Sequence, residues 1–240
     1  MFAMMTKTFM EQHGLEARDM GLLPISQRRW AMGNPRAAYR KDLSLEDYLG
    51  ARVVYDPLSA YDCVPVVSGA EAILISHQVD PGQHVEVVAQ ELPFNLDDQL
   101  GDGFLDTQVV ANLSANLYSR AGLGVEDIDV VGVYDDYPVM AIEQARAFGV
   151  VKGDDVRRYL HDQLDREQFP VNTSGGQLSA GQAGCGAGLH FIVEAVQQLL
   201  GHSKSRQVPG ARHALVSNYG MVTYRHGACL AGTILRRGEK

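Results

Sequence analysis

The 240-residue sequence is poor in cysteine and has no basic block and no long apolar run. Its three cysteines, Cys63, Cys185 and Cys229, have neither the paired spacing of zinc ligands nor an even number. This excludes the common zinc and disulfide frameworks. The formal net charge of -8 argues against a nucleic-acid-binding face. Because no signal peptide and no apolar run of about twenty residues is evident, we expect no membrane span and a cytoplasmic location.

What the sequence does contain indicates a globular α/β protein that binds small molecules or proteins. With 45% hydrophobic residues, a chain of this length can bury one large core or two small ones. Residues 1–21 have apolar side chains at roughly helical spacing, and Gly14 predicts the end of a helix. The stretch "AEAILIS" at 70–76 predicts a buried strand, and "HVEVVAQEL" at 84–92 predicts a second strand.

A helix and then a strand are expected in the middle of the chain. Residues 107–123 place Leu113 and Leu117 on one helical face, behind a cap at Asp106 or Thr107. The following stretch "EDIDVVGVYD" has no polar alternation, which predicts a central strand of the sheet. Four polar residues, at 134–137, then occupy the carboxyl end of this strand, where ligands bind in α/β sheets. Two interpretations have similar weight here, because Asp135 and Asp136 are also suited to capping the next helix.

The second unusual stretch is the glycine-rich "PVNTSGGQLSAGQAGCGAGLHFIVEAVQQLLG" at 170–201. Its last part predicts a helix with a buried face, made by Leu189, Val193, Val196 and Leu200. Backbone amides at the start of this helix suit an anionic or enolate oxygen, whereas the lysine and spacing of a phosphate loop are absent. His190 in this helix has a purely structural interpretation as well.

Three separated motifs carry a family resemblance. "AGLGVEDIDVVGVYDDYPVMAIEQARAFG" resembles the strand and "HDCF" loop of the lipid-transfer-protein and sterol-carrier-protein-X branch of the thiolase superfamily. "PVNTSGGQLSAGQ" is similar to the "NPSGGLISxGHP" loop of that branch, and "ALVSNYGM" is similar to another active-site loop. The resemblance implies a layered αβαβα fold. Residues 1–90 would be the end of the N-terminal half and residues 91–240 the C-terminal half, without the portion that carries the nucleophilic cysteine.

Departures from the motifs determine the expected chemistry. The histidine and cysteine of "HDCF" correspond to Tyr134 and Asp136, and the histidine of "GHP" corresponds to Gln182. Ordinary thiolysis needs those groups, whereas a retro-aldol reaction of a 3-hydroxyacyl thioester needs only a proton acceptor and donors for the enolate. The lipid-transfer-type steroid aldolases have a tyrosine like Tyr134, although their second tyrosine does not match Gln182. We expect Tyr134 to move the hydroxyl proton and Asp136 to tune or relay it.

The resemblance thus supplies a set of candidate site residues. The expected catalytic residues are Tyr134, Asp136 and Gln182, and the expected substrate-binding residues are Tyr137, Gly176, Asn218, Tyr219 and Tyr224. Asn218 has an alternative interpretation as a turn residue.

Three hypotheses of different classes follow. The favoured one is an acyl-CoA carbon–carbon lyase of the aldolase kind. The others are a thiolase or acyltransferase whose cysteine lies on another segment or chain, and a non-catalytic acyl-CoA-binding subunit. Coenzyme A, as part of the substrate, is the only cofactor expected, with no metal in this chain. The resemblance further implies a chain that supplies the N-terminal half, a zinc-bearing OB-fold acyl-CoA-binding protein, and a homodimer or hetero-oligomer.

Overall fold

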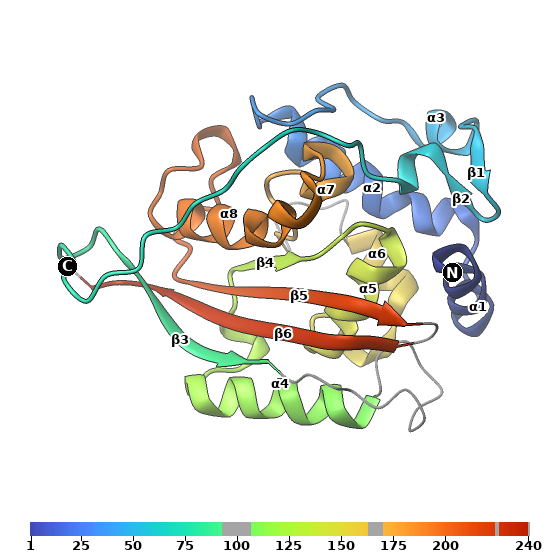
Figure 1. Ribbon diagram of the computed structural model, residues 1–240. Coiled ribbons are helices and arrows are strands. Elements are labelled where there is room, and N and C mark those ends of the chain that lie inside the picture. Colours follow the sequence, from blue (N-terminus) through green and yellow to red (C-terminus); the bar gives the residue numbers. More distant parts are fainter. Residues whose placement is uncertain (93–106, 163–169, 224–225, 240) are drawn as a thin grey trace.

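A mixed four-stranded sheet lies at the centre of the computed structural model, which describes residues 1–92, 107–162, 170–223 and 226–239 (Figure 1). The strand order is β3–β6–β5–β4. β5 is parallel to β4 and antiparallel to β6, and β6 is antiparallel to β3. The strands are β3 (Val85–Glu91), β4 (Val130–Val133), β5 (His213–Thr223) and β6 (His226–Arg237).

Helices cover both faces of this sheet. α4 (Thr107–Ala121) packs on β3 and β6, and α8 (His190–Leu199) packs on β4 and β5 from the other side (Figure 1). Val131 of β4 therefore belongs to the apolar cluster on the α4 side of the sheet. Its neighbour Val130 belongs to the apolar cluster on the α8 side. Burial on both faces explains why the strand lacks polar alternation. β4 is nevertheless an edge strand of the four-stranded sheet rather than the predicted central one, and residues 170–172 bond to its outer side.

The N-terminal helices α1 and α2 pack mainly against other helices rather than on the four-stranded sheet. α1 (Phe2–His13) ends at Gly14, which has φ 60°, as the sequence predicts. α2 (Ala17–Met32) is buried along most of its length and contacts the short helix α7 (Gly176–Ala180). The remaining elements are α3 (Leu45–Leu49), α5 (Pro138–Ala147), α6 (Val156–Asp162), the small strands β1 (Val53–Tyr55) and β2 (Leu58–Ser59), and the 3₁₀ turns η1 (Ala60–Asp62), η2 (Val125–Asp127), η3 (Lys152–Asp154), η4 (Gly184–Leu189) and η5 (Lys204–Arg206).

One apolar cluster joins the two predicted parts of the chain. Phe9 and Leu23 share it with Leu117, Ile142 and Ile234. The boundary at residue 90 stays a prediction. Each helix in the described part of the chain is too short or too polar to span a bilayer.

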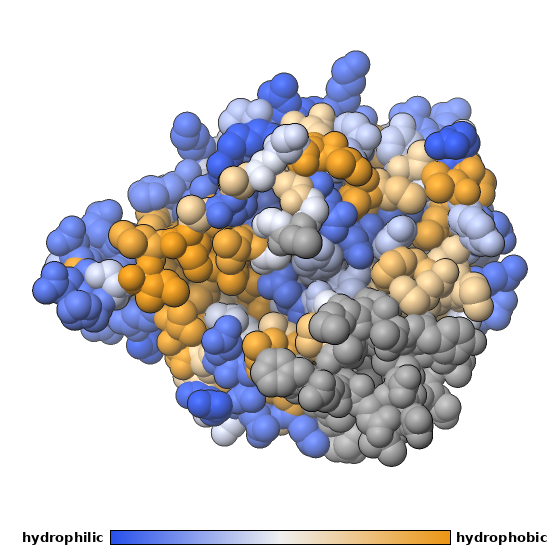
Figure 2. Space-filling model, viewed as in Figure 1, coloured by the Kyte–Doolittle hydropathy of each residue, from blue (hydrophilic) through white to orange (hydrophobic). Residues whose placement is uncertain are grey.

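The buried strand predicted at 70–76 is wrong. These residues form no regular element, and the side chains of Leu74 and Ile75 are 94% and 86% exposed. A strand is buried only where neighbours satisfy its backbone and cover its side chains, and in the described residues this stretch lies outside the four-stranded sheet. Figure 2 shows apolar surface where this segment crosses the molecule. The second predicted strand is confirmed as β3.

The buried face predicted for the helix at 189–200 is also wrong. Its four predicted members, Leu189, Val193, Val196 and Leu200, are each only half-buried. The buried apolar face is made by Phe191, Ala195 and Leu199, and Glu194 and Gln198 are buried beside it in a polar network. Thr173 donates to Glu194 at 2.8 Å, Gln198 donates to Thr173 at 3.0 Å, and Arg206 pairs with Glu194 at 2.8 Å. A periodicity of apolar residues does not detect buried polar side chains that satisfy one another.

Candidate active site

Two buried amide side chains fix the backbone where β4 ends. Asn172 accepts from the amide of Val133 at 2.8 Å and donates to its carbonyl at 3.0 Å. Gln144, on α5, donates to the carbonyl of Tyr134 at 2.7 Å. α5 begins at Pro138, and its N-cap residue Tyr137 makes no side-chain capping bond. The residues before α5 are therefore held in place by neighbours rather than by capping that helix.

Asp135 caps a different helix, α7. It is fully buried and accepts hydrogen bonds from the amides of Gln177 at 2.8 Å and Leu178 at 3.4 Å. Burial raises the pKa of Asp135 well above its usual range. A Cβ atom at Gly176, which has φ 60°, would lie 2.0 Å from an Asp135 oxygen. Packing therefore requires glycine at 176, and its substrate-binding role stays a prediction.

Tyr134 and Gln182 are in direct contact. The Gln182 amide donates to the phenolic oxygen of Tyr134 at 2.8 Å. Backbone hydrogen bonds also hold Gln182 to residues 65–67. The backbone N–H of Gln182 donates to the Pro65 carbonyl at 2.9 Å, and the Gln182 backbone carbonyl accepts from the Val67 N–H at 3.3 Å. Burial raises the pKa of Tyr134 above its ordinary value. The phenol is therefore protonated at neutral pH, and its own proton is available for another acceptor.

Asp136 and Tyr219 form the second pair of the cluster. The Tyr219 hydroxyl, on β5, donates to Asp136, and its ring lies edge-on to the Tyr134 ring with centroids 5.3 Å apart. Burial raises the pKa of Asp136 to about 6, although the bond from Tyr219 lowers it in part. At neutral pH this carboxylate is mostly ionised, with a basicity that suits proton transfer. Burial also raises the pKa of Tyr219, which keeps it a donor.

We name the four residues Tyr134, Asp136, Gln182 and Tyr219 the tyrosine–aspartate cluster. They come from the end of β4, the loop after α7 and β5. Four of the eight candidates thus form two contact pairs, although their roles stay predictions. Such a cluster can accept one proton and donate others, which is the requirement of acid–base chemistry on a bound acyl group.

The other candidates lie around this cluster or outside the described residues. Tyr137 stacks on Phe2 of α1, with ring centroids 4.3 Å apart. Asn218 lies on β5 opposite Ala231, not in a turn, and its buried Oδ1 has no hydrogen-bond partner among the described residues. Tyr224 lies outside the described residues. Within the described part of the chain, no group of three His, Cys, Asp or Glu side chains is arranged to hold a metal ion.

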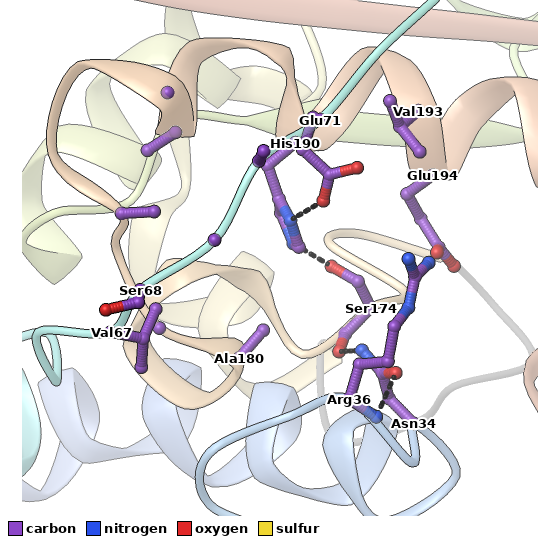
Figure 3. A pocket seen from close by; sticks show the side chains of 16 residues that line it. Asn34, Arg36, Val67, Ser68, Glu71, Ser174, Ala180, His190, Val193 and Glu194 are labelled. Atoms are coloured by element: carbon purple, nitrogen blue, oxygen red, sulfur yellow. Dashed lines mark hydrogen bonds and ion pairs between the residues drawn. The ribbon is translucent and has the colours of Figure 1, made fainter.

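A cavity of about 190 Å³ is lined in part by residues of the glycine-rich stretch between Ser174 and His190 (Figure 3). Ser174, His190 and Glu71 line it, together with Arg36 and Asn34. No sequence motif predicts this group, because its members come from three segments that lie far apart in the chain. None of the tyrosine–aspartate cluster residues is among the residues that line this cavity.

The mixed sheet with helices on both faces defines a layered α/β protein. The sequence model of the family "Thiolase C-terminal domain-like" matches residues 102–233, and the chain belongs to this family. The resemblance noted from the motifs is therefore confirmed.

Several curated relatives cover almost the whole chain. An acetyl-CoA acetyltransferase of Methanothermobacter thermautotrophicus is 28% identical over 229 residues, which are 92% of this chain and 59% of the relative. Sterol carrier protein 2 of Rattus norvegicus is 27% identical over 251 residues, which are 99% of this chain and 45% of the relative. A 17-hydroxy-3-oxo-4-pregnene-20-carboxyl-CoA lyase of Mycobacterium tuberculosis is 28% identical over 230 residues, which are 90% and 58% of the two chains. The chain thus spans about half the length of these relatives.

Solved structures confirm the predicted fold class. The Ltp2-ChsH2(DUF35) aldolase matches with a TM-score of 0.77 at 22% identity, over 98% of this chain and 62% of the other. A monomeric SCP2-thiolase like protein from Mycobacterium smegmatis matches with a TM-score of 0.69 at 16% identity, over 100% and 52%.

Proposed function

We propose that this chain carries the acid–base residues of an enzyme that cleaves a carbon–carbon bond in an acyl-CoA. The proposed reaction is the retro-aldol cleavage of a 3-hydroxyacyl-CoA with a branched or cyclic tail, such as a steroid or other lipid side chain. The observation that carries the proposal is the tyrosine–aspartate cluster. It holds two phenols, an amide and a carboxylate at the positions where the motif resemblance implies the groups of Claisen chemistry.

The pKa shifts and hydrogen bonds of the cluster support one role for Asp136 and another for Tyr134. Asp136, with a pKa of about 6, accepts the proton of the substrate's 3-hydroxyl group. A carbonyl then forms at C3, the C2–C3 bond breaks, and its electron pair moves into the thioester enolate. The enolate takes the proton from Asp136 at C2, which gives the shortened acyl-CoA and restores the carboxylate. Tyr134 donates its hydrogen bond to the developing negative oxygen, because Gln182 already occupies one of its acceptor sites. The sequence predicted Tyr134 as the group that moves the hydroxyl proton, but burial keeps its phenol protonated. We therefore give the proton-accepting role to Asp136 and a hydrogen-bond-donating role to Tyr134.

The names of the relatives support an acyl-CoA substrate but leave two reaction types open. One relative is a CoA lyase and another is an acetyltransferase. A thiolase or acyltransferase with its cysteine elsewhere is the second candidate, and a non-catalytic acyl-CoA-binding subunit is the third. Free coenzyme A distinguishes the first two, because thiolysis consumes it and retro-aldol cleavage does not.

We propose further that this chain works in a complex. The Ltp2-ChsH2(DUF35) aldolase is named as a combination of two components, which supports a partner for this chain. The exposed apolar side chains of Val66, Leu74 and Ile75 also favour association. The proposed partners are a chain that supplies the N-terminal thiolase half and a zinc-bearing OB-fold protein that binds acyl-CoA. Homodimers or hetero-oligomers would satisfy this proposal.

Tyr134→Phe tests the proposed role of the cluster. The assembled complex is incubated with a branched 3-hydroxyacyl-CoA, and release of the ketone is followed by mass spectrometry. Loss of a positioned donor should reduce the rate by about a hundredfold to ten-thousandfold, with little change in substrate binding. Tyr39→Phe is the matched control, because the ring under Arg28 is kept and the residue lies outside the cluster. Cleavage by Tyr134→Phe at the parental rate would remove the basis of the proposal.

A further inference from the structure

The 190 Å³ cavity contains a second chemical group of side chains (Figure 3). The His190 Nε2 atom lies 2.7 Å from the Ser174 hydroxyl, and the His190 Nδ1 atom lies 3.5 Å from a Glu71 carboxylate oxygen. In Figure 3 the three side chains form one line across the cavity, from the loop at 174 through α8 to the segment at 71. A nucleophile, a base and an orienting carboxylate in this order are the parts of a hydrolytic triad.

The surroundings give these three groups the required protonation states. The bond from His190 lowers the pKa of Glu71, so its carboxylate is ionised at neutral pH. A carboxylate opposite Nδ1 favours the tautomer that carries its proton there, which leaves Nε2 as the acceptor. The Ser174 hydroxyl is then the donor in the 2.7 Å bond. This is the arrangement that activates a serine oxygen.

Ser174 is held in place and lines the cavity. The residue is 1% exposed, and its carbonyl accepts a 2.9 Å hydrogen bond from the side chain of Asn34. Arg36 also lines the cavity and brings a positive charge to it. The volume is below the roughly 300–1,000 Å³ of pockets for drug-sized ligands, so the site fits an acyl group of only a few carbons.

We propose that Ser174, His190 and Glu71 form a second catalytic site, which hydrolyses small carboxylic esters or thioesters. The Ser174 oxygen bonds to the acyl carbon while its proton moves to His190. The alcohol or thiol leaves with that proton, and an acyl-serine forms. Water then attacks the acyl carbon and gives a proton to His190, and the free acid leaves as this proton returns to Ser174. Glu71 orients His190 and stabilises its charged form throughout. This activity is independent of the proposed retro-aldol reaction.

A serine-directed probe tests the site without any substitution. The 240-residue chain is treated with a fluorophosphonate and digested, and the modified residue is identified by mass spectrometry. Labelling at Ser174 of the folded protein is the expected result. Labelling elsewhere, or none, would overturn the proposal.

Hydrolysis of p-nitrophenyl acetate measures the activity itself. Ser174→Ala and His190→Gln should each reduce the rate by about a hundredfold or more, and Glu71→Gln should reduce it less. Ser76→Ala is the matched control, because Ser76 is an exposed serine that does not line the cavity. It should keep the parental rate. A Ser174→Ala variant that hydrolyses the ester like the parent would refute the assignment.

Discussion

Replacement of Asp136 by asparagine should slow the proposed reaction and stabilise the protein at the same time. Burial raises the pKa of Asp136 from 3.8 to about 6, so the folded protein favours the neutral acid. At neutral pH the ionised carboxylate therefore opposes folding. Asp136→Asn keeps the shape and an acceptor for the Tyr219 hydroxyl but removes the charge. The proposed base is lost with it, and the rate should fall by about a hundredfold or more.

The size of the stability effect follows from the same pKa change. A pKa raised from 3.8 to about 6 corresponds to about 3 kcal/mol. The folded state keeps this advantage of the neutral acid below pH 3.8 and loses it as the pH rises through about 6. The stability of Asp136→Asn relative to the parent should therefore increase between about pH 4 and pH 6.5 and then level off, with a total change of up to about 3 kcal/mol.

Urea unfolding at pH 4.5 and pH 7.5 measures this difference. The pH-independent part, which comes from packing of the new amide, cancels when the two values are compared. A gain that is equal at both pH values would show that Asp136 has no raised pKa. The reasoning about its basicity would then be refuted, whatever happens to the rate.

The remaining predictions concern the packing at Gly176, the buried charge of Glu194, the exposed side chain of Leu74 and the metal content of the chain. Gly176→Ala should destabilise the fold by about 2 kcal/mol or more in urea unfolding, because its Cβ would meet Asp135, whereas Gly188→Ala has open space and should cost far less. Arg206→Met should cost about 3–5 kcal/mol by leaving the buried carboxylate of Glu194 unpaired, and an unchanged unfolding midpoint would contradict this. Leu74→Ser should leave the stability of the isolated chain within about 0.5 kcal/mol but weaken association in light scattering. Elemental analysis after chelation should find no stoichiometric metal on the isolated chain, and retained zinc would contradict that expectation.

Local sequence patterns predicted much of the fold. The first helix with its glycine end, the helix with Leu113 and Leu117, and strands β3 and β4 follow from periodicity and capping signals that act within a few residues. Motif resemblance supplied the layered fold. It also selected loops that the structure brings together, since Tyr134 contacts Gln182.

The failures came from interactions that no local pattern contains. Residues 70–76 have the composition of a strand, but a strand also needs a neighbour. The buried side of α8 contains Glu194 and Gln198 besides apolar residues, and the burial of these two depends on Thr173 and Arg206 elsewhere in the chain. The raised pKa of Tyr134 could not be predicted from the sequence either, because it depends on how deeply the phenol is buried.

Product analysis in the absence of free coenzyme A tests the central claim most directly. The parental complex and its Asp136→Asn variant are each given a branched 3-hydroxyacyl-CoA, and the ketone and the shortened acyl-CoA are quantified by mass spectrometry. The account predicts that the parent releases both products in equal amounts without added coenzyme A, and that Asp136→Asn releases about a hundredfold less. Cleavage that requires free coenzyme A, or that proceeds at the parental rate in Asp136→Asn, would contradict it.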